Sequence, residues 1–178
     1  MPGIAATKQT TATNGESAQR NGAGRCSGWT NIVGLTIGIY LLYEHDTGRA
    51  ATLRIDSDGV VVSMQTYATL RTIWTTVAAG TNGTILFYDY LGGRAVAGKV
   101  DTDGNYTDGQ AYPDTQGNPP LPNPYTIVAG LSNGTLLFYN DSQRSAVTAR
   151  MSADGSVPIY NTIPAGTFQA WTHIVGIK

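Results

Sequence analysis

The most apolar stretches of this chain recur three times, and turn-forming residues bound each of them. Residues 39–43, 85–88 and 136–139 are continuously apolar and end in tyrosine, a pattern typical of a strand that is buried on both faces. Asn82-Gly83 and Asn133-Gly134 precede the second and third runs. This dipeptide favours a type I′ hairpin, because both central residues adopt positive φ. Each run is therefore predicted to be the second strand of a hairpin.

Shorter strand-like runs surround each of these hairpins. A first strand is predicted at 30–33, 75–78 and 126–129. After the apolar run comes a stretch of alternating pattern, in which Ala50, Thr52 and Arg54 face one way and the residues between them face the other. An Asp-x-Asp-Gly turn or its variant follows and leads into a more polar fourth strand. Each unit is therefore predicted to contain four antiparallel strands.

The units repeat in register when Trp29, Trp74 and Tyr125 are aligned. A period of about 45 residues marks a repeat architecture that buries a shared core. We predict an all-β fold, a propeller-like ring of four-stranded antiparallel units, with a β-trefoil as the alternative. The complete repeats span residues 29–73, 74–124 and 125–170.

The two ends of the chain carry parts of a further repeat. Residues 1–28 keep the spacing of a third and fourth strand, and residues 171–178 begin with Trp171 as a first strand would. The ends are therefore predicted to share one incomplete unit that lacks its second strand, which makes residues 1–178 a single repeat domain. Residues 113–124 are rich in proline and are predicted to form a surface loop.

The composition removes several classes of partner. Among 178 residues only 13% are charged, the net charge is −1, and no basic stripe is present. Nucleic acid is therefore not an expected partner. No apolar stretch is long enough for membrane insertion, and the N-terminus lacks the apolar core of a signal peptide. The chain is accordingly expected in the cytoplasm or secreted by a non-classical route.

The sequence contains no recognisable catalytic constellation. The two histidines, His45 and His173, lie at non-equivalent positions of the repeat, and no glycine-rich phosphate loop precedes a helix. We therefore predict that the chain is not an enzyme and holds no cofactor. One turn has oxygen donors spaced as in a calcium loop, although a purely structural turn is the favoured interpretation. Its candidate ligands are Asp101, Asp103, Asn105 and Asp108.

Three rows of recurring side chains are candidates for ligand binding. Hydroxyls, cations, carboxylates and amides all hydrogen-bond sugar hydroxyls, and aromatic rings stack on the apolar faces of sugars. The tyrosines at the end of the apolar strand are predicted to bring their hydroxyls to the rim. Cross-strand pairing between the other two rows is the structural alternative. The rows are Tyr43, Tyr88 and Tyr139; Arg54, Lys99 and Arg150; and Glu44, Asp89 and Asn140.

The repeat Trp-Thr-x-Ile-Val, followed by Asn-Gly-Thr-Leu-Leu-Phe-Tyr and Asp-x-Asp-Gly, resembles the repeats of propeller lectins, loosely of the tachylectin type. The resemblance covers nearly the whole chain and rests on repeat length, aromatic spacing and strand order. It implies a protein that binds glycans or glycoconjugates at several equivalent weak sites without catalysis. The alternative is a structural, self-assembling protein whose incomplete unit pairs with a neighbouring protomer. Either interpretation predicts a homo-oligomer.

Overall fold

The computed structural model describes residues 28–35, 38–68, 70–113, 121, 125–131, 133–171 and 174. Within these residues the chain forms three antiparallel sheets of four strands each, in the orders β1-β2-β3-β4, β5-β6-β7-β8 and β12-β11-β10-β9. No helix occurs among the described residues. The all-β prediction is therefore confirmed.

Each sheet comprises consecutive strands joined as hairpins. The first sheet contains β1 (Asn31–Gly34), β2 (Ile39–Tyr43), β3 (Ala50–Ile55) and β4 (Val61–Tyr67). The second contains β5 (Thr76–Ala79), β6 (Thr84–Asp89), β7 (Arg94–Val100) and β8 (Tyr106–Tyr112). The third contains β9 (Ile127–Gly130), β10 (Thr135–Asn140), β11 (Ser145–Arg150) and β12 (Ile159–Ile163).

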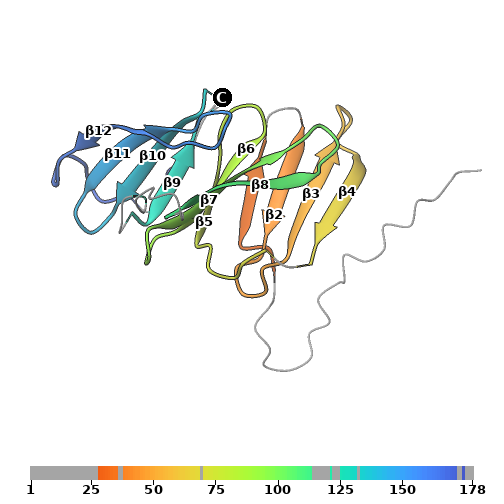
Figure 1. The fold of residues 1–178 in the computed structure, drawn as a ribbon, viewed down its shortest axis with the longest axis horizontal. Coiled ribbons are helices and arrows are strands. Elements are labelled where there is room, and N and C mark those ends of the chain that lie inside the picture. The colour runs from red at the N-terminus through yellow and green to blue at the C-terminus, as the bar shows by residue number, and fades with distance from the viewer. Residues whose placement is uncertain are drawn as a thin grey trace, which may run out of the picture.

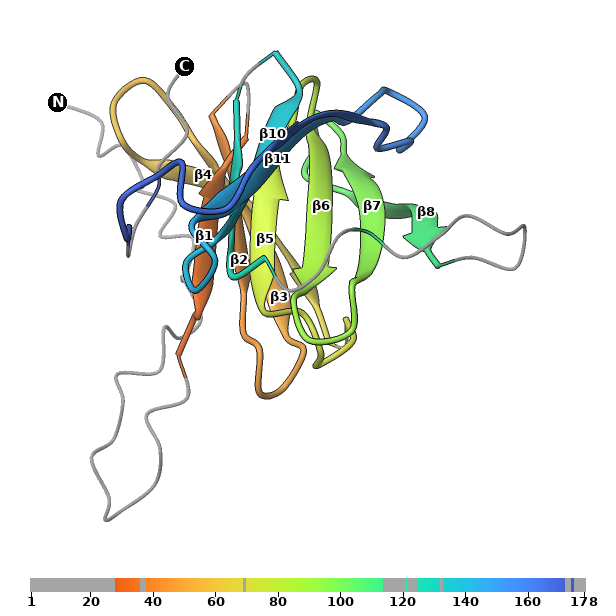
Figure 2. The same cartoon turned by 90° about the vertical axis from the view of Figure 1, so that its left-hand side faces the viewer.

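The three sheets stand side by side like consecutive blades of a propeller, with the second sheet between the other two (Figures 1 and 2). Their first strands are neighbours, because β5 contacts both β1 and β9. Two cores result. One lies between the first and second sheets and includes Leu41, Ile85 and Phe87, and the other lies between the second and third sheets and includes Leu86 and Phe138. We call these two interfaces the first seam and the second seam.

This arrangement explains the apolar second strands. All six residues of β6 are buried, because one face of the strand packs into the first seam and the other into the second. The turn before it has φ of 53° at Asn82 and 76° at Gly83, so the positive φ pair expected of an Asn-Gly hairpin is present. The half-buried alternation predicted for the third strands is wrong at their starts, since Ala50, Ala51 and Thr52 are all buried, as are Ser145, Ala146 and Val147. A bulge interrupts the pairing of the third and fourth strands in every sheet.

Separate four-stranded sheets confirm the propeller-like class over the β-trefoil. The incomplete unit predicted for the chain ends falls on residues 1–28 and 171–178, of which only Gly28, Trp171 and Ile174 lie within the described residues. The shared unit and the single-domain organisation therefore stay predictions. Most of the proline-rich stretch at 113–124 also lies outside the described residues. The described part of the chain contains no helix that is long and apolar enough to cross a membrane.

Candidate functional site

The two seams are joined by equivalent tyrosines at the end of the fourth strand. In the first seam the Tyr67 hydroxyl donates to the carbonyl of Gly104 at 2.7 Å and accepts from the amide of Tyr106 at 2.8 Å. In the second seam the Tyr112 hydroxyl donates to the carbonyl of Gly155 at 3.0 Å and accepts from the amide of Val157 at 2.9 Å. Each tyrosine thus pins the Asp-x-Asp-Gly-type turn of the following sheet.

A cavity of about 320 Å³ opens at the second seam, beneath the turn that Tyr112 pins. Strands β7 and β8 form one side of this seam pocket, and the turn at residues 153–155 of the third sheet forms the other. Its volume lies at the lower end of the range of about 300–1,000 Å³ that is typical of small-molecule sites. The lining residues are Thr84, Ala97, Gly98, Lys99, Asp101, Thr107, Asp108, Gly109, Ala153, Asp154 and Gly155.

Small residues create the space for this pocket. In the first seam the Thr52 hydroxyl donates to the carbonyl of Gly104 at 2.6 Å and is buried. The equivalent residue of the second repeat is Ala97, which has no hydroxyl to fill the corresponding place. Gly98 stands where the first repeat has Leu53, on the other face of the strand, and Tyr106 occupies the place of its side chain. The pocket therefore coincides with a local departure from the repeat.

The charged groups around the seam pocket are one ammonium, on Lys99, and three carboxylates. Asp101 accepts from the side-chain amide of Asn105 at 3.0 Å and from the backbone amides of Asn105 and Asp103 at 2.8 and 2.9 Å. These bonds, that of the Asn105 side chain first, lower the pKa of Asp101. Asp154 accepts from the amide of Ser156 at 2.9 Å, which lowers its pKa in the same way. Both carboxylates are therefore ionised at neutral pH.

The third carboxylate, on Asp108, is positioned by a tyrosine. The Tyr106 hydroxyl donates to Oδ1 of Asp108 at 2.8 Å. Burial raises the pKa of Tyr106, and the hydrogen bond to Asp108 raises it further, so the phenol keeps its proton. The ring of Tyr106 lies against Gly98, where any side chain would collide with it. Gly98 thus makes room for Tyr106, and Gly98, Tyr106 and Asp108 lie on the first-seam side of the sheet, opposite to the side chains of Lys99 and Thr107.

The predicted tyrosine row does not reach the rim. Tyr43, Tyr88 and Tyr139 are fully buried, and the hydroxyls of Tyr43 and Tyr139 donate to the carbonyls of Arg71 and Gln169 at 2.6 and 2.7 Å. The prediction that these hydroxyls lie at the surface is wrong, because the apolar strand that ends in them is buried between sheets. They tie each sheet to the segment that follows it.

The cationic and acidic rows lie at opposite ends of the strands. Arg54 pairs with Ile39 at the start of β2, whereas Glu44 follows the end of that strand at Tyr43. Five residue steps of about 3.3 Å separate the two levels by roughly 17 Å. Cross-strand pairing between these rows is therefore wrong. Of the cations, Arg54, Lys99 and Arg150 are all exposed, and Lys99 lines the seam pocket.

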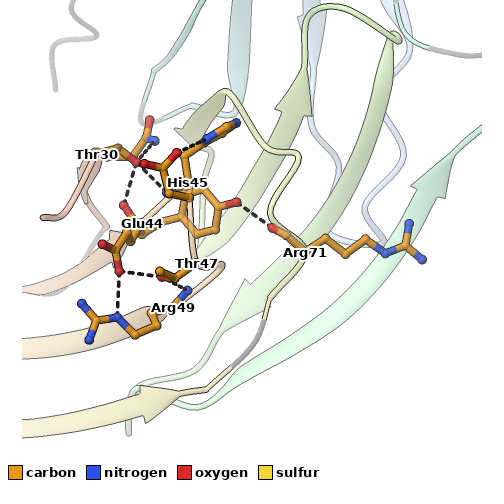
Figure 3. A network of polar contacts seen from close by, with 9 residues as sticks. Thr30, Glu44, His45, Thr47, Arg49 and Arg71 are labelled. Atoms are coloured by element: carbon orange, nitrogen blue, oxygen red, sulfur yellow. Dashed lines mark hydrogen bonds and ion pairs between the residues drawn. The ribbon is translucent and has the colours of Figure 1, made fainter. Parts of the chain in front are cut away.

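The acidic row instead stabilises hairpin turns. Glu44 is buried, and one of its carboxylate oxygens accepts from Thr47 at 2.5 Å and from Arg49 at 2.7 Å (Figure 3). The bond from Thr47 is the main cause that lowers the pKa of Glu44 against the opposing effect of burial. Asp89 accepts from the backbone amide of Leu91 and Asn140 from that of Gln143, each within its own turn. This row has a structural role.

The predicted calcium loop is a hydrogen-bonded turn. Both oxygens of Asp101 accept hydrogen bonds from Asn105, and one also accepts from the amide of Asp103. Asp108 lies beyond this turn and is bonded to Tyr106. Within the described residues no group of three or more histidine, cysteine, aspartate or glutamate side chains is arranged to hold a metal ion.

Lys99, Asp101 and Asp108 were candidate binding residues from the sequence alone, whereas the other residues of the seam pocket were missed. Ala97, Gly98 and Gly109 carry no chemical group, so they attracted no functional interpretation. The signal that identifies them is their small size at positions where the first repeat has threonine, leucine and methionine. A search for departures from the repeat would have found this site, whereas a search for recurring residues favoured the buried rows.

No protein-family model matches this sequence, and no curated protein matches it. Solved structures do match. A candidate 6-phosphogluconolactonase from Bacteroides fragilis aligns over 78% of this chain and 40% of its own, at 15% identity and a TM-score of 0.57. A second, from Bacteroides uniformis, covers 72% and 38% at 12% identity and a TM-score of 0.52. A protein from Lactobacillus plantarum covers 78% and 42% at 14% identity and a TM-score of 0.53.

These similarities show the fold. The chain spans about two-fifths of the length of each of these neighbours. They also correct two predictions. The resemblance to lectins holds only at the level of the propeller, since none of these neighbours is named as a lectin. The prediction that the chain is not an enzyme is contradicted, because two neighbours are named as candidate lactonases. A lack of metal-site and phosphate-loop motifs was no ground for excluding catalysis on this fold.

Proposed function

We propose that the seam pocket binds a neutral, hydroxyl-rich ligand of the sugar or sugar-lactone class. The observation that carries the proposal is an open cavity at a sheet-to-sheet interface whose lining alternates hydroxyls, carboxylates and one ammonium with small residues. Groups of this kind donate to and accept from sugar hydroxyls in both directions. The small residues Ala97, Gly98 and Gly109 leave room for the ligand to approach the strands closely.

The charges select against a phosphorylated ligand. Three carboxylates and one ammonium give the lining a net negative charge at neutral pH, so a phosphate dianion would be repelled. A neutral sugar or lactone carries no such penalty. The two neighbours named as candidate 6-phosphogluconolactonases support lactone chemistry, and the charge of this pocket favours the unphosphorylated form of that substrate class.

The same lining carries the groups that lactone hydrolysis requires. Asp154, whose Oδ1 accepts from the amide of Ser156, is the lining carboxylate that we assign to take a proton from a water molecule as that water attacks the lactone carbonyl. The ammonium of Lys99 stabilises the negative charge that develops on the carbonyl oxygen. The ring C–O bond then breaks, its oxygen takes up the proton, and the open-chain acid leaves.

Calorimetric titration of the full chain with gluconolactone, glucose and 6-phosphogluconate tests this proposal. We expect measurable binding of the first two and none of the phosphorylated acid. Ala97→Thr, which introduces the residue that fills the first seam, and Lys99→Gln are expected to weaken binding. The matched control is Arg54→Gln, the equivalent cation of the first repeat, which lies outside the pocket lining. Binding that Ala97→Thr leaves unchanged would place the ligand elsewhere and reject the seam pocket.

Catalysis is read out separately by following the acid released from gluconolactone in weakly buffered solution. The chain is expected to exceed the spontaneous rate, and Asp154→Asn is expected to lower the catalysed rate while leaving binding in place. A rate equal to the spontaneous one, together with intact binding, would reject hydrolysis and retain the binding site.

A further inference from the structure

One position of the repeat differs sharply in exposure among the three sheets. Ile32 is 64% exposed, whereas the equivalent Val77 and Val128 are 6% and 7% exposed. The second and third sheets each pack this position against a preceding sheet. No sheet precedes the first one among the described residues. Its outward side is therefore a seam surface without a partner.

This surface, which we call the first-sheet face, consists of Ile32, Tyr40, Leu53, Val61 and Met64. Tyr40 pairs with Leu53, which pairs with Met64, so an apolar row crosses β2, β3 and β4. Tyr40 is 39% exposed, while the equivalent Ile85 and Leu136 are inaccessible. None of these five side chains is charged. A contiguous apolar surface of this kind is typical of an interaction site.

The two seams within the chain define what fits such a face. In both, the partner is the opposite side of another copy of the same repeat, and its fourth-strand tyrosine binds the glycine turn. The third sheet has Ile163 at the position of this tyrosine, so it can repeat the apolar packing of a seam but not the tyrosine bridge. The corresponding turn of the first sheet, at Gly59, is exposed and has no neighbouring side chain. Among the described residues, one sheet has its opposite side outside both seams, namely the third (β9–β12).

The three equivalent tryptophans show where one repeat packs on the repeat before it. Trp74, at the start of the second repeat, is 3% exposed within the first seam. The equivalent Trp29 and Trp171 are 42% and 38% exposed, at the two ends of the arc of sheets. Trp171 packs on Tyr139 at 5.4 Å between ring centroids and donates its amide to the Tyr139 hydroxyl at 3.3 Å. The third sheet thus already holds a tryptophan at the place where a following repeat begins.

The sequences that follow Trp29 and Trp171 are nearly identical. Residues 29–34 are Trp-Thr-Asn-Ile-Val-Gly and residues 171–176 are Trp-Thr-His-Ile-Val-Gly. A side of the third sheet that accepts Trp171 therefore offers the right surface to Trp29 of another molecule. Trp171 of the same chain and Trp29 of a second molecule therefore compete for the surface of the third sheet around Tyr139. The C-terminal segment accordingly limits the association of two molecules.

We propose that a second copy of this chain covers the first-sheet face with the outer side of its third sheet, so that the apolar packing of a seam, without its tyrosine bridge, is repeated between molecules. The contact is heterologous, and it forms a closed ring if the rotation closes and an open chain if it does not. The three sheets align with only about 40% of a propeller neighbour. In the part of the chain that the structure describes, the first-sheet face and the outer side of the third sheet both lie outside the two seams.

Light scattering coupled to size-exclusion chromatography of the full chain tests the proposal across a range of concentrations. The wild type is expected to gain mass as concentration rises, and Trp171→Ala to shift this gain to lower concentration. Ile32→Asp and Thr148→Arg each block one of the two surfaces and are expected to give monomers. Leu91→Asp, at an exposed turn outside both surfaces, is the control and should behave as wild type.

A mixing experiment distinguishes the orientation. Ile32→Asp retains a free third sheet and Thr148→Arg retains a free first-sheet face, so an equimolar mixture is expected to form dimers that neither variant forms alone. Dimers that persist in Thr148→Arg but vanish in Ile32→Asp would mean that two first-sheet faces meet, which overturns the proposal. A wild type and Trp171→Ala that stay monomeric at every concentration would also overturn it. So would a monomeric wild type destabilised by Ile32→Asp, because residues 1–27 would then cover the face.

Discussion

The two seams share one mechanical design and differ in one detail. Tyr67 and Tyr112 make the same pair of hydrogen bonds to the next turn, and an aromatic cluster fills each core. In the first seam Thr52 adds a second donor to the turn carbonyl, whereas in the second seam Ala97 leaves a cavity. The difference teaches that a repeat can acquire a binding site by losing volume at a few positions while its structural contacts stay unchanged.

Alkaline pH is expected to have the largest effect, because it acts on both seams together. Burial raises the pKa of Tyr43 and of Tyr88 to about 12, from an ordinary value near 10. The folded state therefore favours the neutral phenol, and its contribution to stability is fully present below about pH 10 and is lost as the pH rises towards 12. Denaturant unfolding at pH 9, 10.5 and 11.5 measures this. A free energy of unfolding that is constant over this window would contradict the burial of these tyrosines.

Gly98→Ala is expected to damage the second sheet through the first seam. The added methyl group collides with the ring of Tyr106, and overpacking of this kind typically costs about 1–3 kcal/mol. The third repeat has alanine and valine at the equivalent positions, Ala149 and Val157. Adding Tyr106→Val should therefore restore much of the loss, which thermal and denaturant unfolding of the single and double variants would measure. No recovery in the double variant would show that another contact causes the damage.

Removal of the bridging tyrosine hydroxyl should cost more stability in the second seam than in the first. Tyr112→Phe leaves the Gly155 carbonyl and the Val157 amide without this buried partner, at a cost of about 1–3 kcal/mol. Tyr67→Phe should cost less, because Thr52 still donates to the Gly104 carbonyl. Denaturant unfolding of both variants shows which loses more of its free energy of unfolding. Equal losses would mean that the Thr52 bond contributes little to the first seam.

Ala97→Thr should make the second seam resemble the first. The new hydroxyl is placed to donate to the Gly155 carbonyl as Thr52 donates to that of Gly104, which is expected to add about 0.5–1.5 kcal/mol of stability. The pocket would shrink at the same time. A gain in melting temperature combined with a loss of ligand affinity is the expected result. A loss of stability would indicate that the second seam is too tight for threonine.

The repeat made much of this fold accessible from the sequence. Apolar runs ending in Tyr43, Tyr88 and Tyr139 located the second strands, and Asn82-Gly83 located a hairpin, because strand periodicity and turn chemistry are local properties. The predictions that were wrong concerned residues whose surroundings depend on which sheet covers which face. The tyrosines were expected at the rim, but their position beneath the next repeat depends on packing between sheets, which the pattern of one strand does not encode.

The seam pocket was the hardest feature to anticipate from the sequence. Lys99 and Asp108 were noticed as charged residues, yet the cavity beside them depends on Ala97 and on the turn at 153–155, which lies more than fifty residues away along the chain. Absence of side-chain volume has no chemical signature of its own. It becomes visible only when equivalent positions of different repeats are compared in a structure.

The unequal burial of the three tryptophans also gives this protein an intrinsic optical reporter. Trp74 is enclosed between two sheets, while Trp29 and Trp171 are open to solvent. The emission of the chain therefore combines one blue-shifted, shielded indole with two red-shifted ones that a neutral quencher such as acrylamide can reach. Without any added dye, the spectrum distinguishes events inside the first seam from events at the two ends of the arc.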